Sequence, residues 1–173
     1  IGEGASPYRE GGVYVVIGGA GGIGQALSEH LIRTRHARIV WIGRRPEDAA
    51  IAQARTRLGA LGPMPLYLAA DAADPAALER VRDEVLARHG AIHGVVHAAI
   101  DLLDKSAAQM DEPRLRAGLS AKVGASVRIG QVFGALPLDF MLFLSSLAGL
   151  VRAAGQGNYA AGCTFKDAYA LQL

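Results

Sequence analysis

The sequence predicts an α/β fold, a doubly wound parallel sheet flanked by helices, and three observations support it. Five short apolar runs rich in β-branched residues alternate with longer helical patterns over the 173 residues, which is typical of parallel strands joined by right-handed crossovers. Their continuous rather than alternating apolar character indicates strands that helices cover on both faces. Hydrophobic residues make up 51% of the chain and charged residues 20%, which excludes a disordered chain and favours one domain.

The elements follow in order from these patterns. We expect strands at residues 13–17, 38–42, 65–69, 94–97 and 139–144. The expected helices cover residues 22–34, 47–61, 75–89, 112–135 and 157–171. The helix over 75–89 has the clearest ends, because Asp74 can cap it, Pro75 suits its first turn and Gly90 stops it.

Charge and composition exclude several functions. A formal charge of +2 with one adjacent arginine pair, Arg44 and Arg45, argues against nucleic acid as a partner. No apolar stretch reaches the roughly 18 residues of a membrane helix, and residues 1–12 lack a signal-peptide pattern. The single cysteine, Cys163, excludes an internal disulfide and fits a reducing compartment. We therefore expect a cytoplasmic protein with no membrane contact.

No metal is expected either. His93 and His97 would share one face of a predicted strand. Four strand rises place them about 13 Å apart, which is too far for joint zinc ligation. Both are interpreted as structural, although His97 heads a turn toward the predicted ligand edge.

A glycine-rich loop lies directly between the first predicted strand and the first helix. It consists of Gly18, Gly19, Ala20, Gly21, Gly22, Ile23 and Gly24. Glycines permit a tight turn and a close approach of the backbone to a pyrophosphate, and the following helix N-terminus offers free N–H groups. An ordinary flexible loop is the alternative, but the strand–loop–helix context favours dinucleotide binding by a Rossmann-type fold.

The end of the second strand indicates which dinucleotide is bound. Arg44 follows the last loop glycine by 20 residues, where an arginine accommodates a 2′-phosphate and an acidic residue would bind a ribose hydroxyl. The sequence therefore predicts NADP(H) as the cofactor. The alternative is that Arg44 and Arg45 are two solvated surface arginines without a ligand. Asp71, after the third strand, is expected either to contact the adenine or to cap a turn.

Candidate catalytic groups follow the fifth strand. Ser145 and Ser146 stand at its carboxyl end, and Tyr159 opens the last helix. A tyrosine can protonate a carbonyl oxygen that is receiving hydride, provided that a cation and an orienting hydroxyl are near. The chain offers three lysines for this purpose, Lys105, Lys122 and Lys166.

These motifs resemble the ketoreductase domains of modular polyketide synthases, a branch of the short-chain dehydrogenase/reductases. The resemblance rests on residues 12–14, 18–24, 43–44, 94–99, 122–123, 143–146, 158–161 and 165–168. Most short-chain dehydrogenases carry a lysine four residues after the tyrosine, where this chain has Cys163. Polyketide ketoreductases take it from the preceding long helix, and Lys122 matches it, 24 residues before Ser146, which is 13 before Tyr159.

The resemblance implies NADPH-dependent reduction of a β-ketoacyl thioester, held on an acyl carrier protein within a synthase of neighbouring domains, to a β-hydroxyacyl thioester. Tyr159 would protonate the alkoxide, Ser146 would fix its oxygen, and Lys122 would hold the ribose and stabilise the tyrosinate. The implied cofactor site comprises residues 18–24, Arg44, Arg45, Asp71, Ala72, His97, Ala98 and Ala99.

The chain departs from the family's pattern at three places. Cys163 stands where an asparagine is usual and offers only a weak S–H bond, so it replaces a proton-relay partner or is a small buried residue. Ile17 replaces a threonine before the glycine loop. The sequence also ends inside the tyrosine helix, so we expect residues 13–173 to be a catalytic domain without its last strands and lid. Separately, residues 1–12 resemble a linker from a preceding subdomain.

The resemblance also predicts stereochemistry. Leu102 and Asp104 match the first and last residues of the family's Leu-Asp-Asp signature, with Leu103 between them, and Val151 stands where the opposing class has tryptophan. With Ser145 as a further substrate contact, this favours the B-type product, a D-configured hydroxyl. An Asp104 that only caps a turn is the alternative.

Two other functions remain open. The same fold can serve as a catalytically silent scaffold in a megasynthase, although an intact tyrosine and glycine loop argue against it. A free-standing short-chain dehydrogenase ranks third, because it would carry a lysine at position 163.

Overall fold

A computed structural model describes residues 6–151 and 153–173. All five predicted strands form, as β1 (Val13–Ile17), β2 (Arg38–Gly43), β3 (Leu66–Ala69), β4 (Gly94–His97) and β5 (Phe140–Phe143). They pair in parallel in the order β3-β2-β1-β4-β5. The order reverses between β1 and β4, which is the position where open sheets of this kind bind ligands.

The helices follow the predicted alternation. They are α1 (Gly22–Arg35), α2 (Ala49–Gly59), α3 (Pro75–His89), α4 (Glu112–Leu119), α5 (Ala125–Phe133) and α6 (Gly157–Gln172). The ends of α3 are confirmed, since the Asp74 carboxylate accepts a bond from Ala76 N at 3.0 Å and Gly90 adopts φ 76°. Helix α2 begins two residues later than predicted, because Asp48 is its cap and accepts from Ile51 N.

The helix predicted over residues 112–135 forms from Glu112 to Phe133, but it is not one regular α-helix. A π-helical turn, η2 (Ser120–Gly124), separates α4 from α5, and α5 ends at Phe133. A π turn changes the direction in which the following side chains point, and such turns are frequent at functional sites. Periodicity alone does not detect it, because a π turn shifts the apolar face without interrupting it.

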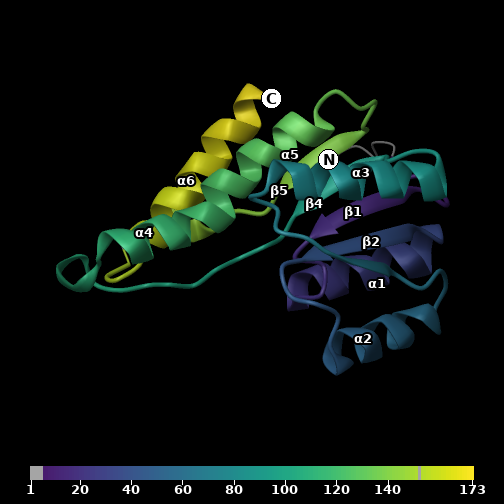
Figure 1. The fold of residues 1–173 in the computed structure, drawn as a ribbon, viewed down its shortest axis with the longest axis horizontal. Helices are drawn as coiled ribbons and strands as arrows, with labels where there is room; N and C mark the ends of the chain where they lie inside the picture. Colours follow the sequence, from purple (N-terminus) through teal and green to yellow (C-terminus); the bar gives the residue numbers. More distant parts are fainter. Residues whose placement is uncertain (1–5, 152) are drawn as a thin grey trace.

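Helices cover both faces of the sheet, as the apolar runs predicted (Figure 1). Along β1, Val13, Val15 and Ile17 belong to the cluster that includes α3 and α5. Tyr14 and Val16 alternate with them and belong to the cluster that includes α1 and α2. Every residue of β1 is therefore buried, and the prediction of a doubly wound Rossmann-type sheet is confirmed.

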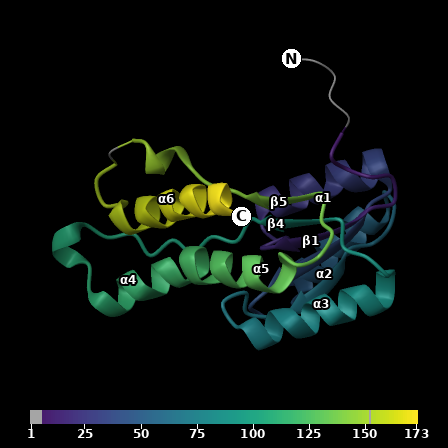
Figure 2. The same cartoon turned by 90° about the horizontal axis from the view of Figure 1, so that it is seen from above.

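Part of the structure extends beyond the sheet. Figures 1 and 2 both show α4, α6 and the irregular chain that follows β4 projecting to one side of the strands. Helix α6 packs against α5, where Tyr169 Oη donates to the Val127 carbonyl at 3.4 Å. Gly130 makes this contact possible, since a Cβ there would lie 2.3 Å from the Tyr169 hydroxyl oxygen.

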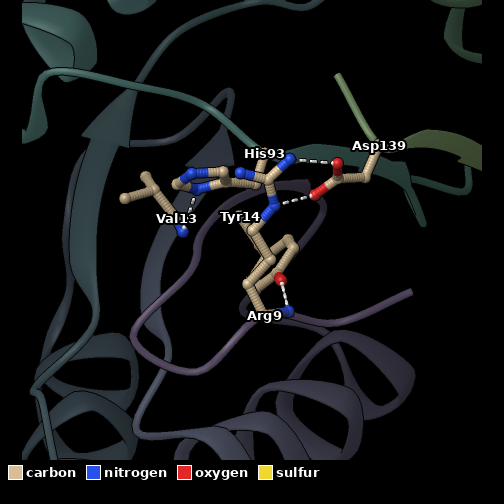
Figure 3. A network of polar contacts seen from close by, with 5 residues as sticks. All are labelled: Arg9, Val13, Tyr14, His93 and Asp139. Atoms are coloured by element: carbon tan, nitrogen blue, oxygen red, sulfur yellow. Dashed lines mark hydrogen bonds and ion pairs between the residues drawn. The ribbon is translucent and has the colours of Figure 1, made fainter. Parts of the chain in front are cut away.

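The chain before β1 is tied to the amino end of the sheet (Figure 3). Arg9 forms an ion pair with Asp139, and its backbone N–H donates to the Tyr14 hydroxyl at 2.6 Å. His93 Nδ1 accepts from Val13 N at 2.9 Å. Of the predicted linker, residues 1–5 lie outside the described residues, and the described part is anchored to the domain. No described helix combines the length and apolar character needed to cross a bilayer.

Candidate active site

A cavity of about 520 Å³ opens at the carboxyl ends of the first four strands. Nine predicted cofactor residues line it: Gly18, Ala20, Gly21, Arg44, Arg45, Asp71, Ala72, Ala98 and Ala99. Others on its wall were not predicted, including Tyr67, Ile100, Ser120 and Ala121. The structure thus brings together residues from four predicted loops. The volume of the cavity suits a cofactor site.

The loop glycines have separate geometric roles. Gly18 has φ +79°, and a Cβ there would lie 2.7 Å from the Ala99 backbone. At Gly19 a Cβ would lie 2.1 Å from Trp41, and at Gly24 it would lie 2.6 Å from Gly19. These three glycines pack the loop against the sheet, and of the three only Gly18 also lines the cavity.

The other half of the loop faces open space. Gly21 and Gly22 are exposed, and a Cβ at Gly22 would meet nothing within 4 Å. Gly21 caps α1 without a side-chain bond, so the first-turn amides of α1 are free for a ligand. Ile23 is also exposed, and neither it nor Gly22 or Gly24 lines the cavity.

The two predicted phosphate-binding arginines stand at the cavity wall and are paired. Arg44 Nη2 lies 3.0 Å from the Asp101 carboxylate, and Arg45 Nε lies 3.4 Å from Asp48. Arg44 therefore links the end of β2 to the chain after β4. Asp71 lines the cavity, and its carboxylate accepts from Ala73 N at 2.9 Å in a turn, while its contact with the adenine stays a prediction.

His97 lies below this wall. It is 1% exposed and does not line the cavity, whereas Ala98 and Ala99 do. Both of its ring nitrogens lack a hydrogen-bond partner among the described residues. Burial, aided by the charge of Lys166, lowers the pKa of His97 to about 3, so its ring is neutral.

Lys122 reaches Tyr159 across 37 residues of sequence. Its Nζ lies 2.9 Å from the centroid of the Tyr159 ring and donates to the Tyr159 carbonyl at 3.1 Å. Lys122 is 2% exposed, and burial lowers its pKa. The predicted lysine and tyrosine are therefore in contact.

Two features of α6 and η2 make this contact possible. The π turn carries Lys122, and Gly162 leaves space for its stem, since a Cβ at Gly162 would lie 2.5 Å from Lys122 Cδ. Cys163 Sγ lies 3.7 Å from Lys122 Nζ. Cys163 is thus both a small buried residue and a neighbour of the lysine.

Tyr159 itself is half-buried in the first turn of α6. Its backbone N–H donates to the carbonyl oxygen of the Asn158 side chain at 2.8 Å. Asn158 is buried, and Gly118 on α4 makes room for it, since a Cβ there would lie 2.8 Å from Asn158 Nδ2. Asn158 was not among the predicted site residues, and its only signal in the sequence is its place beside Tyr159.

The serines follow β5 as predicted but differ in their surroundings. Ser146 is half-buried and its Oγ accepts from Ala148 N at 3.2 Å, capping the short turn η3 (Leu147–Gly149). Ser145 is exposed, and its Oγ donates to the Cys163 carbonyl at 3.5 Å. Ser145 is therefore bonded to α6, whereas Ser146 is bonded within its own turn.

The predicted stereocontrol residues lie in irregular chain. Leu102 and Val151 are exposed. Asp104 is half-buried, and its Oδ1 is buried without a hydrogen-bond partner in the described chain. That oxygen therefore caps no turn. Its negative charge acts on Lys122 and partly opposes the lowering of that pKa.

Comparison with known proteins agrees with this arrangement. The family model described as the KR domain matches residues 12–173. The chain belongs to the KR domain family. Its parallel sheet is that of the short-chain dehydrogenase/reductase fold, which implies a nicotinamide cofactor.

The KR domain has close relatives among polyketide synthases. It is 54% identical over 168 residues to the polyketide synthase ThaG of Burkholderia thailandensis, covering 97% of this chain and 3% of that protein. It is 55% identical over 166 residues to PksN of Bacillus subtilis, covering 96% and 3%. The chain therefore spans a small part of the multidomain synthases that it matches.

Solved structures share the fold. A ketoreductase domain from the bacillaene assembly line superposes with a TM-score of 0.91 at 28% identity, covering 98% of this chain and 41% of that one. An N-terminal ketoreductase from the macrolactin assembly line gives 0.86 at 28% identity, covering 90% and 32%. Within residues 6–151 and 153–173, no three His, Cys, Asp or Glu side chains gather as a metal site would require.

Proposed function

We propose that this KR domain reduces a β-ketoacyl thioester, presented on an acyl carrier protein, to a β-hydroxyacyl thioester with NADPH. The observation that supports this most directly is the contact of Lys122 with Tyr159, 2.9 Å from Nζ to the ring centroid. Both residues lie on elements that the fold brings to the carboxyl side of the sheet. A scaffold without catalysis has no need to bury a lysine at this tyrosine.

The lining of the cavity suits a dinucleotide that carries a 2′-phosphate, as NADPH does. Its wall combines the open glycine backbone at Gly21 with Arg44 and Arg45. Free first-turn amides and a helix dipole favour the pyrophosphate, and two cations favour a 2′-phosphate. Arg44 is paired with Asp101. We propose that Arg44 exchanges this carboxylate for the 2′-phosphate when the cofactor binds.

The residues of the chain supply the proton and orient the carbonyl. NADPH, when bound, supplies the hydride. The Tyr159 hydroxyl donates its proton to the oxygen that becomes the alcohol. The Lys122 ammonium, held over the ring, stabilises the tyrosinate that remains. The Ser146 hydroxyl donates a hydrogen bond to the same substrate oxygen and fixes its position.

Cys163 lies where it can affect how Tyr159 regains the proton that it donates to the substrate. Its Sγ lies beside Lys122 Nζ at 3.7 Å, in the place of the asparagine that the resemblance leads one to expect. We propose that the domain is active with this cysteine, because the lysine still reaches the tyrosine. Replacing Cys163 with asparagine is expected to change turnover less than removing Tyr159.

For stereochemistry we propose the B-type, D-configured product. Leu102 and Asp104 lie on the irregular chain that follows β4. The negative charge of Asp104 favours the charged form of Lys122. Chiral chromatography of the hydroxyacyl product tests this assignment. A product that is mainly the L-hydroxyl would contradict it.

The first test of the proposed function is NADPH oxidation, followed at 340 nm, by the full-length protein with a β-ketoacyl pantetheine thioester. We expect consumption that prefers NADPH to NADH and is lost in Tyr159→Phe. Binding of NADPH by both proteins, measured by fluorescence, controls for folding. A protein that binds NADPH without consuming it would be a scaffold.

A further inference from the structure

Two lysines are buried among the described residues, and the proposed reaction uses only one of them. Lys166 on α6 is 2% exposed, as is Lys122. Its Nζ donates to the Leu144 carbonyl at 3.2 Å. No role for Lys166 was predicted from the sequence.

A buried ammonium without a carboxylate is unfavourable. None of the ion pairs among the described residues includes Lys166, and the adjacent Asp167 is exposed. Burial, with a smaller contribution from the charge of Lys122, lowers the pKa of Lys166 to about 8. A methionine of similar length would fill the same space without the desolvation penalty. The position therefore calls for an explanation beyond packing.

The side chain lies on the catalytic face of α6. Positions 159, 163 and 166 are spaced by four and three residues, so they share one side of the helix. Tyr159 and Cys163 both contact Lys122 from this side. Lys166 continues the same row toward the end of β5.

Lys166 binds Leu144, which directly precedes Ser145 and the proposed catalytic Ser146. Leu144 N donates to the His97 carbonyl at 3.0 Å, which extends the pairing of β4 and β5 by one step. Its own carbonyl accepts from Lys166, and the next residue, Ser145, bonds the Cys163 carbonyl. Two bonds therefore join the start of the serine segment to α6, and the bond to Lys166 is the shorter.

We propose that Lys166 is a positioning residue for the proposed reduction, on which this inference rests. By holding the Leu144 carbonyl it sets the distance between Ser146, on the segment after β5, and Tyr159, on α6. We assign it no contact with substrate or cofactor, because its Nζ is bound to the Leu144 carbonyl. Its effect reaches the reaction through Ser146.

A double-mutant cycle in the full-length protein tests this role. Lys166→Met is expected to lower kcat by roughly 10- to 100-fold, as a displaced catalytic group does. The KM for NADPH is expected to stay within about twofold, because the cavity wall is intact. In a Ser146→Ala background the same change is expected to lower kcat by less than about threefold, since coupled residues are not additive.

Three controls make the result specific. Lys166→Arg keeps a charged donor and is expected to recover part of kcat. Arg88→Met makes a similar change on the exposed surface of α3, where Glu84 is the one partner of Arg88 among the described residues, and is expected to have no effect. Hydrogen exchange at residues 144–149, which needs no activity, is expected to rise in Lys166→Met alone.

Each outcome supports or overturns the inference. An unchanged kcat in Lys166→Met, or an equal loss with and without Ser146, overturns it while leaving the proposed function intact. A wild-type protein that does not oxidise NADPH overturns both. If Lys166→Met fails to bind NADPH, Lys166→Arg and Lys166→Gln enter the same cycle, and additive losses with Ser146→Ala then count against the role.

Discussion

Glycine at position 162 shows how one residue decides the geometry of the candidate site. The stem of Lys122 passes where a Cβ would stand, 2.5 Å from Cδ. A side chain there forces the lysine away from the Tyr159 ring. The contact on which the proposed function depends therefore needs a residue without a Cβ in the middle of α6.

We expect Gly162→Ala to lower kcat by roughly tenfold or more, because Lys122 loses its position over Tyr159. Alanine favours helices over glycine by about 1 kcal/mol, which offsets part of any loss of stability. Gly157→Ala is the matched control on the same helix, since a Cβ there meets nothing within 4 Å. Kinetics and thermal unfolding of both variants separate the two effects, and equal kcat values would contradict the assigned role.

Arg44 allows a prediction about the cofactor. Arg44→Ala is expected to weaken NADPH binding by roughly 10- to 100-fold, the value of one hydrogen bond to a charged group, and to leave NADH binding unchanged. Titration calorimetry with both nucleotides checks this. Arg88→Ala controls for loss of an exposed arginine, and an equal loss of affinity for NADPH and NADH would show that Arg44 does not read the phosphate.

At the scale of elements, caps and turns fix where helices begin and how they point. Asp48 and Asp74 each satisfy a free amide at the start of a helix. The π turn between α4 and α5 departs from regular α geometry inside a helical segment, and Lys122 lies on it. Regular elements were thus predictable from local signals, and the functional irregularity was not.

The cap of α3 is open to a direct test. Asp74→Ala is expected to lower the free energy of unfolding by about 1 kcal/mol, because the Ala76 amide loses its acceptor. Glu79→Ala, an exposed acidic position inside the same helix, is the control and is expected to change stability little. Urea unfolding of the two variants provides the comparison, and equal stabilities would remove the capping role.

At the scale of the whole molecule, burial of charge links stability to pH. The pKa of His97 is about 3 in the folded protein and about 6.5 in an unfolded chain. The unfolded state therefore takes up a proton first as the pH falls. The stability that neutral His97 contributes is complete above pH 6.5 and is lost progressively toward pH 3. Lys166 and Lys122 are the charged groups that oppose its protonation.

Acidification from pH 7.5 to 5.0 is expected to reduce the stability of the wild type by roughly 2 kcal/mol more than that of His97→Gln. Urea unfolding at the two pH values measures this difference. His30→Gln, at an exposed position of α1, is expected to behave as the wild type does. The same pH dependence in His97→Gln and the wild type would assign the loss to other groups.

The sequence by itself determined the alternation of elements, the glycine loop at the sheet's switch point, and the residue types of the candidate site. These follow from local chemistry: apolar runs, turn glycines and caps act over a few neighbouring residues. Tertiary structure alone decided the π turn, the space at Gly162 and Gly118, the pairing of Arg44 with Asp101, and the burial of Lys166. Each of these depends on what lies opposite in space, many residues away, and no pattern along the chain records that distance.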